Sequence, residues 1–225
     1  MRTVVALFTM LLSLAACAQD TPGKFKAGQH YEVLPTAVAQ DDNSKVEVTE
    51  LFWYGCGHCY HFEAPLKKWQ KTMPADVALK KIPAIWQPVM EVHARMFYVA
   101  EAMGVMDKVH DPIFAAIAQQ RKMFANRDGR NWKPDDAAIA AIFTDNGADG
   151  EKAVKLLNSF AINSKIKQGQ AKQRAYNLTG TPEMVVAGKY RISTSLPGLK
   201  GKSNGQQLML DVVDFLIEKE RAEKG

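Results

Sequence analysis

The sequence predicts an α/β fold in which a βαβ unit and a ββα unit are separated by a long helical insertion. Residues 46–54 are rich in β-branched and aromatic side chains, and a helical segment and a second apolar run, 77–82, follow them. Residues 184–224 contain two short apolar runs around a glycine turn and a final amphipathic segment. Between these units, residues 89–176 show helical periodicity and no convincing strand.

The first unit contains three predicted strands and one helix. We expect Tyr31–Leu34 to form a short edge strand and Val46–Tyr54 to form a buried central strand. Helical spacing of apolar residues then extends from Gly57 to about Met73. Because the strand Val77–Ile82 follows this helix, we expect it to pair in parallel with the central strand.

The insertion is expected to consist of helices only. Its last stretch, 148–178, is predicted to form one long helix or two joined helices. The apolar residues expected to face inward there are Leu156, Leu157, Phe160 and Ile166. After the insertion, the strands Met184–Val186 and Tyr190–Ile192 flank Gly188 as a hairpin, and the last helix follows.

Composition indicates a globular chain of moderate basic charge. Of the 225 residues, 47% are hydrophobic and 24% are charged, which is typical of a chain that can bury one good core. The formal net charge of +5 favours the approach of acidic partners. The lysines are dispersed and form no basic stripe interleaved with aromatic residues, so we expect no nucleic-acid binding.

The N-terminus is typical of a secretory signal peptide, which we assign to residues 1–18. A positive end precedes a largely apolar segment of fourteen residues, Thr3–Ala16, which is too short to span a bilayer comfortably. Two cleavage patterns are open. "LAAC" resembles a lipobox that would lipidate Cys17, and "ACA" fits cleavage before Gln19; we favour the lipobox. Either pattern predicts a periplasmic protein, and with the lipobox its only membrane contact is a lipid anchor on Cys17.

Two of the three cysteines form the tetrapeptide "CGHC", Cys56–Cys59, which we call the CGHC motif. A disulfide within it closes almost no loop, so a purely structural disulfide is a weak interpretation. A structural zinc site needs four ligands. The sequence has no second CxxC, and its other histidines show no paired spacing with the motif, so we expect no metal site.

The CGHC motif lies where the central strand passes into the predicted helix. The first N–H groups of a helix have no intrahelical partners and its dipole favours negative charge, so a thiolate at Cys56 is stabilised. His58, when protonated, adds to this effect. A lowered thiol pKa makes the reduced form more stable and the disulfide more oxidising. Cys59 lies one turn deeper, so we expect Cys56 to form the mixed disulfide and Cys59 to resolve it.

A second candidate site is "GTP", Gly180–Pro182, directly before the hairpin. One interpretation is a loop breaker, since proline is tolerated at the start of a strand. The other is a cis Thr181–Pro182 bond packed against the CGHC motif. In that arrangement the peptide edge of Thr181 is free to pair with an extended substrate.

The combination of these features resembles the DsbA family of bacterial thiol:disulfide interchange proteins. The similar segments are "ELFWYGCGHCYHFE" and "NLTGTPEMVVAGKY", and the resemblance covers nearly all of the chain after the signal. It implies a thioredoxin fold at 28–88 and 177–222 with an all-helical domain inserted at 89–176. It also implies that the protein oxidises unfolded exported proteins with free thiols and is reoxidised by a DsbB-type membrane quinone reductase.

The resemblance also implies roles for individual residues. Cys56 matches the nucleophile, Cys59 the resolving thiol, and Pro182 the cis-proline, with Thr181 before it as a substrate-binding residue. The redox-active Cys56–Cys59 disulfide then serves in place of a bound cofactor.

Glu50 matches an acidic residue beneath the active site, with Lys81 on the next strand as its expected partner. A carboxylate inside an apolar strand must be paired or neutral. It either relays a proton to Cys59 or forms a structural ion pair, and the sequence leaves both interpretations open.

Two departures from the family pattern concern tuning. Gly57 stands where many members have proline, which is expected to loosen the first helical turn, and Gly-His also occurs in eukaryotic disulfide isomerases. Thr181 replaces an apolar residue found in some members.

The alternatives to a disulfide donor are an isomerase or reductase and a non-redox peptide-binding chaperone. Too few residues precede the central strand for the dimerisation domain of bacterial isomerases, so we expect a monomer. The intact CGHC motif argues against the chaperone.

Overall fold

A five-stranded mixed sheet forms the centre of the protein, whose structure, a computed structural model, describes residues 24–224. The predicted signal peptide and Cys17 lie outside these residues. The strand order is β1-β7-β6-β2-β3. The strands are β1 Glu32–Val33, β2 Val46–Phe52, β3 Val77–Pro83, β6 Glu183–Val186 and β7 Tyr190–Ser193.

Strand β2 is the buried central strand that the sequence predicts. All seven of its residues are buried, because it pairs with β3 in parallel on one side and with β6 antiparallel on the other. Strand β1 is at the edge, as expected. The register of β2 with β3 places Glu50 directly beside Lys81, so two charged side chains meet inside the sheet.

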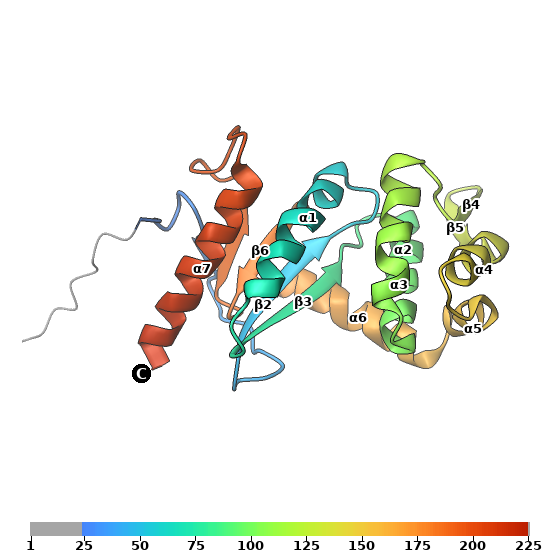
Figure 1. The fold of residues 1–225 in the computed structure, drawn as a ribbon, viewed down its shortest axis with the longest axis horizontal. Helices are drawn as coiled ribbons and strands as arrows, with labels where there is room; N and C mark the ends of the chain where they lie inside the picture. The colour runs from blue at the N-terminus through green and yellow to red at the C-terminus, as the bar shows by residue number, and fades with distance from the viewer. Residues whose placement is uncertain (1–23, 225) are drawn as a thin grey trace, which may run out of the picture.

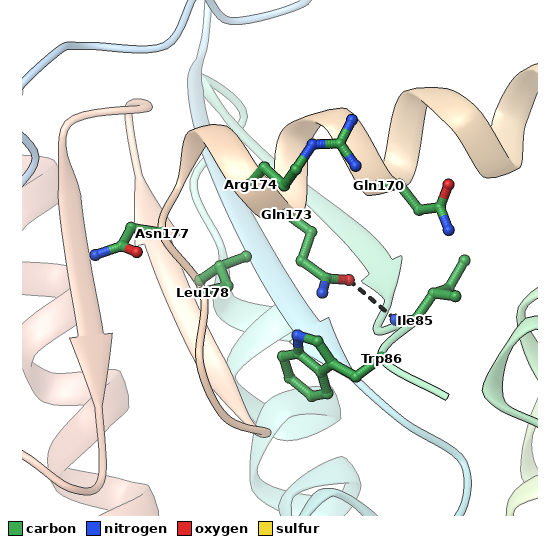
Figure 2. A pocket seen from close by; sticks show the side chains of 7 residues that line it. All are labelled: Ile85, Trp86, Gln170, Gln173, Arg174, Asn177 and Leu178. Carbon is green, nitrogen blue, oxygen red and sulfur yellow. Dashed lines mark hydrogen bonds between the residues drawn. The ribbon is translucent and has the colours of Figure 1, made fainter. Parts of the chain in front are cut away.

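Helices cover both faces of this sheet (Figure 1). Helices α1, Gly57–Thr72, and α7, Gly205–Lys224, pack together on one face. Helix α6, Phe160–Ala175, crosses the opposite face, behind the sheet in Figure 1. Near the end of α6, Gln173 Oε1 accepts a hydrogen bond of 2.9 Å from the N–H of Ile85 (Figure 2). Both residues line a pocket of about 440 Å³, together with half-exposed Trp86.

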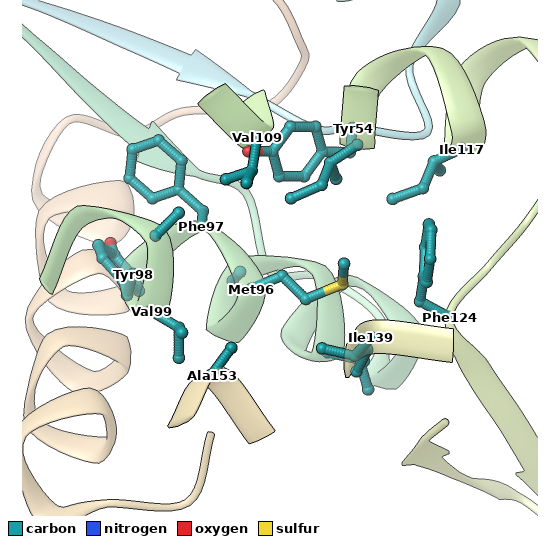
Figure 3. Packing of buried hydrophobic residues seen from close by; sticks show 14 of the residues in the cluster. Tyr54, Met96, Phe97, Tyr98, Val99, Val109, Ile117, Phe124, Ile139 and Ala153 are labelled. Atoms are coloured by element: carbon teal, nitrogen blue, oxygen red, sulfur yellow. The ribbon is translucent and has the colours of Figure 1, made fainter. Parts of the chain in front are cut away.

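The segment between β3 and β6 is built around its own apolar cluster. Its other helices are α2 Pro88–Met103, α3 Met106–Phe114, the π-helical segment Ala115–Gln119, α4 Asp136–Asp145 and α5 Gly150–Leu156. Helix α2 ends at Gly104, which has the left-handed φ of 68° expected of a glycine stop. Figure 3 shows that Tyr54, two residues after the end of β2, also reaches into this cluster. The active-site segment is therefore packed against the inserted helices.

The insertion is not all-helical, which corrects the sequence-based expectation. It contains a two-stranded antiparallel sheet formed by β4, Ala125–Asp128, and β5, Asn131–Pro134. The turn between the strands includes Gly129, with a φ of 60°. The eight strand residues are mostly polar and exposed or half-buried, so they carry no apolar alternation that would reveal a strand in the sequence.

The stretch 148–178 forms two helices, α5 and α6. Ser159 separates them and caps α6, because its side chain accepts a hydrogen bond from the N–H of Ile162. The prediction that Phe160 faces inward is wrong, since it is 90% exposed. The helical period does not continue across the break at Ser159, so the spacing from α5 no longer fixes the direction of Phe160. Within residues 24–224, no helix is long and apolar enough to cross a bilayer.

Candidate active site

The CGHC motif occupies the start of helix α1, directly after strand β2. Cys56 is the N-cap residue, with φ −89° and ψ 112°, and its Sγ accepts a hydrogen bond of 3.4 Å from the N–H of Cys59. Cys56 is half-buried, whereas Cys59 is fully buried. Both are free thiols in this structure. Only Cys56 is therefore accessible to a partner thiol.

The two thiols have opposite acidities. Hydrogen bonding to the Cys59 thiol, then to Thr181 and to the backbone N–H groups of Cys59 and His58, outweighs burial and lowers the pKa of Cys56 to about 5. Burial raises the pKa of Cys59 well above its usual range, and the neighbouring charges of Cys56 and Glu50 act in the same direction. At neutral pH the reduced site holds one thiolate, at Cys56, and one thiol, at Cys59.

The two residues between the cysteines are exposed. The carbonyl of His58 accepts a hydrogen bond of 2.7 Å from Gln206 Nε2 of α7, which ties the first turn of α1 to the last helix. A Cβ added to Gly57 would meet no heavy atom within 4 Å. Nothing in the packing therefore requires glycine at position 57.

The segment Gly180–Pro182 meets the CGHC motif although 125 residues separate them. The Thr181–Pro182 bond is cis, as one of the two sequence interpretations predicts. The carbonyl oxygen of Thr181 accepts a hydrogen bond of 3.4 Å from Cys56 Sγ. Pro182 is buried, while Thr181 is half-buried beside the accessible thiol.

Beneath the cysteines lies a buried group that we call the acid cluster, formed by Glu50, Glu63 and Lys81. Lys81 Nζ lies 2.6 Å from Glu50 Oε2 and 2.5 Å from Glu63 Oε1. Two carboxylates thus share one ammonium in a site where Glu50 is completely buried. Burial, partly offset by Lys81 and reinforced by the charge of Glu63, raises the pKa of Glu50 to about 7.

Glu63 behaves in the opposite way. Burial raises its pKa, but hydrogen bonding to His110 and the charge of Lys81 outweigh burial and lower it to about 2. The pKa of Lys81 is itself raised, because its two carboxylate partners outweigh the effect of burial. Near neutral pH, Glu50 is therefore the carboxyl of the acid cluster that can gain or lose a proton.

Sequence reasoning missed three members of this environment: Glu63, His110 and Tyr54. Glu63 follows Cys59 by four residues, and this spacing on one helix was a usable signal. His110 Nε2 lies 3.4 Å from Glu63 Oε2, and its Nδ1 lies 2.8 Å from the hydroxyl of Tyr54. His110 belongs to α3 of the insertion, and no local pattern connects it to the CGHC motif.

The acid cluster adjoins a cavity of about 340 Å³, which Glu63, Lys81 and His110 line together with exposed Asp107 and Asp111. Glu50 does not line this cavity. A proton that passes between Glu50 and the cavity must therefore cross the other members of the acid cluster.

One group within the described residues has the spacing of metal ligands. Glu63, His110 and Asp111 place ligand atoms within 4.8 Å of one another. However, Lys81 pairs with the carboxylate of Glu63 and Lys67 pairs with that of Asp111. The carboxylates are thus already neutralised by ammonium groups, which disfavours a cation there, and three ligands fall short of a structural zinc site.

Comparison with known proteins agrees with this geometry. A family model described as a DSBA-like thioredoxin domain matches residues 47–204. The thiol:disulfide interchange protein DsbA of Pseudomonas aeruginosa is 37% identical over 220 residues, covering 98% of this chain and 95% of the relative. DsbA of Azotobacter vinelandii is 36% identical over 215 residues, covering 95% and 94%.

Solved structures show the same relationship. The crystal structure of Pseudomonas aeruginosa DsbA matches with a TM-score of 0.77 at 37% identity, covering 89% of this chain and 96% of that one. The oxidoreductase DsbA from Xylella fastidiosa matches with a TM-score of 0.75 at 25% identity, covering 88% and 98%. The chain belongs to the DsbA family of thioredoxin-fold proteins and is a thiol:disulfide oxidoreductase.

Proposed function

We propose that the protein works in the oxidising direction, donating its Cys56–Cys59 disulfide to unfolded exported proteins in the periplasm. The observation that carries this proposal is the stabilised thiolate of Cys56 at the start of α1. A group that stabilises the reduced form makes the disulfide a stronger oxidant. The exchange is directed to Cys56 because its sulfur is accessible whereas Cys59 is fully buried.

The proposed reaction has two exchanges. A substrate thiolate attacks Cys56 Sγ, the bond to Cys59 breaks, and Cys59 leaves as a thiolate that takes up a proton. A second thiolate of the substrate then attacks the substrate sulfur of the mixed disulfide and releases Cys56 as a thiolate. Two electrons pass from the substrate dithiol to the cysteine pair, and a DsbB-type membrane quinone reductase is the proposed partner that removes them.

Two groups around the cysteines support these exchanges in the proposal. Thr181 and Pro182 bind an extended substrate segment, because the carbonyl of Thr181 already contacts Cys56 Sγ beside the accessible thiol. Glu50 exchanges the proton that Cys59 requires, since its pKa of about 7 suits proton transfer near neutral pH. Lys81 holds Glu50 in place, and His58 and Gly57 tune the first turn of α1.

The remaining parts of the proposal concern organisation. We place the inserted domain at 89–176 between two thioredoxin segments, and we propose a monomer exported by residues 1–18, with a lipid on Cys17 as its membrane contact. Its resident redox group is the Cys56–Cys59 disulfide, without a further cofactor.

The direction of the reaction is tested by equilibrating the protein with glutathione buffers of defined ratio. We expect the pair to stay reduced except in strongly oxidising buffers, and the thiolate absorbance of the reduced protein to titrate near pH 5. A Cys56→Ser variant should lack this titration. A pair that is oxidised even in strongly reducing buffers would overturn the assignment as a donor and favour a reductase.

A further inference from the structure

The acid cluster contains one more negative group than Lys81 can balance. Both Glu50 and Glu63 contact Lys81 Nζ. A surplus charge is costly in a buried site, so one of the two carboxylates is the place where a proton binds. Of the two carboxylates, Glu50 is the one whose charge acts on Cys59 and raises its pKa.

The environment of His110 distinguishes the two carboxylates. The imidazole is 6% exposed and is enclosed by the rings of Phe52, Phe97 and Phe114. Burial lowers the pKa of His110 and raises that of Tyr54, so the imidazole is neutral and the phenol keeps its proton. The ring therefore carries one N–H, on either Nδ1 or Nε2.

The neighbours of the ring select one tautomer. A proton on Nδ1 would leave the Nε2 lone pair facing Glu63 Oε2 at 3.4 Å, and among the described residues neither of these two atoms has a hydrogen-bond partner. With the proton on Nε2, the hydroxyl of Tyr54 donates to Nδ1 and Nε2–H points at Glu63 Oε2. The second arrangement keeps the Tyr54–His110 hydrogen bond and turns an N–H instead of a lone pair toward Glu63 Oε2, so Tyr54 and His110 form a directed pair beside Glu63.

We propose that Tyr54 and His110 are positioning residues, whose hydrogen-bonded pair keeps Glu63 ionised so that the exchangeable proton of the acid cluster stays on Glu50. Glu63 is faced by Lys81 from β3 and by His110 and Asp111 from α3. The inference rests on the proposed proton exchange between Glu50 and Cys59.

Apart from Lys81, which both carboxylates share, no donor among residues 24–224 reaches Glu50. Its Oε1 has no hydrogen-bond partner among the described residues, and the other groups that act on it are Glu63 and the two cysteines. The pKa values agree with this division, since that of Glu63 is lowered to about 2 and that of Glu50 is raised to about 7.

The test is a site-resolved carbon-13 NMR titration of the glutamate carboxyl groups in the reduced protein. Variants Glu50→Gln and Glu63→Gln assign the two resonances. In the unmodified protein we expect the Glu50 resonance to titrate near neutral pH while the Glu63 resonance stays constant. In His110→Leu both should titrate over the same range, with the amplitude at Glu50 about twofold smaller because the proton is shared.

Two further variants separate positioning from packing. In His110→Gln the amide nitrogen lies near the position of Nε2 and can still donate to Glu63, so the original titration should return. Tyr54→Phe frees the tautomer without touching Glu63 and should give a smaller shift in the same direction. A Glu63 resonance that stays constant in His110→Leu would overturn the inference.

A separate measurement tests the role of Glu50 on which the inference rests. The equilibrium with glutathione, followed against pH, should lose its inflection near neutral pH in Glu50→Gln. If that inflection persists, the proposed role of Glu50 fails, whatever the NMR titration shows for Glu63. If it is lost while His110→Leu leaves Glu63 constant, only the positioning inference fails.

Discussion

The mouth of the active site and the acid cluster beneath it hold charge in different ways. At the mouth, the Cys56 thiolate is stabilised mainly by the Cys59 thiol and by N–H groups of the same helical turn. In the acid cluster, Glu50 and Glu63 depend on Lys81 of another strand and on His110 of the insertion. The mouth is therefore built mostly within one helical turn, to which Thr181 adds a contact from far along the chain, whereas the acid cluster exists only if distant elements dock correctly. Substitutions should affect the two regions differently.

The largest expected effect separates the two cysteines. Cys56→Ser should abolish disulfide formation in a reduced test protein, because the accessible sulfur is lost. Cys59→Ser should also stop turnover, but when it is mixed with oxidised glutathione it should trap a mixed disulfide at Cys56, with one glutathione released as thiolate, since no Cys59 thiol remains to displace the bound half. Mass spectrometry under non-reducing conditions distinguishes the two outcomes. Trapping by Cys59 in Cys56→Ser would contradict the division of roles drawn from burial.

The next effect concerns the acid cluster and is measured as stability. Lys81→Met leaves two buried carboxylates without a counter-charge and should lower the free energy of unfolding by about 3 kcal/mol in urea at pH 7. The loss should shrink at acid pH, where the carboxylates bind protons. Lys80→Met is the matched control: Lys80 is 41% exposed in its pair with Asp41, and its loss should cost about 0.5 kcal/mol. Equal losses in the two variants would contradict the buried geometry.

A third prediction compares the reduced and oxidised forms of the protein as pH changes. The pKa of Cys56 is about 5 in the folded reduced state and near 9 in the unfolded chain, so the unfolded state binds more protons between these values. The stability of the reduced form should therefore rise from pH 5 to pH 9, by about 2 kcal/mol after allowance for partial exposure.

The oxidised form has no thiolate and should lack this rise. Glu50 acts in the opposite sense, since its raised pKa makes stability fall between about pH 4.5 and 7. Burial and Glu63 raise its pKa in both redox forms, so the difference between their melting temperatures reports the Cys56 thiolate together with its effect on Glu50. A difference that is constant with pH would show that the Cys56 thiolate is not stabilised by folding.

The smallest predicted effect is local to the mouth. Gly57→Pro should stabilise the protein by about 0.5–1 kcal/mol, because residue 57 is the first of the helix and Cys56 has the extended conformation that precedes proline readily. Gly57→Ala is the control for the loss of glycine alone. Thermal unfolding of both variants measures the gain, and their glutathione equilibria show whether a stiffer first turn changes the oxidising strength. A destabilised Gly57→Pro would show that the turn needs the N–H of residue 57.

Much of the fold follows from patterns that the sequence displays directly. Strand β2 is visible as an apolar run, and the hairpin of β6 and β7 is visible from its glycine turn. The β4–β5 hairpin is not visible in the sequence, because its residues are mostly polar and show no apolar alternation, although their backbones pair. The inward direction predicted for Phe160 is wrong, because the break at Ser159 interrupts the helical spacing that predicts it.

The candidate site divides in the same way. Cys56, Cys59 and the segment Gly180–Pro182 were found from their spacing and their position between elements. The pairing of Glu50 with Lys81 was also expected, since adjacent parallel strands bring their middles together. Glu63 and His110 were missed, although they govern which carboxyl of the acid cluster takes a proton.

The sequence by itself determined that a reactive cysteine stands at the start of a helix, because helix initiation depends on residues within one turn of Cys56. Only the tertiary structure decided the proton balance of the site. Tyr54, Glu63, Lys81 and His110 come from four different segments, and their contacts arise from the register of β2 with β3 and the docking of α3. Ion pairing and desolvation depend on distances of a few ångströms between such segments, and no local pattern along the chain encodes those distances.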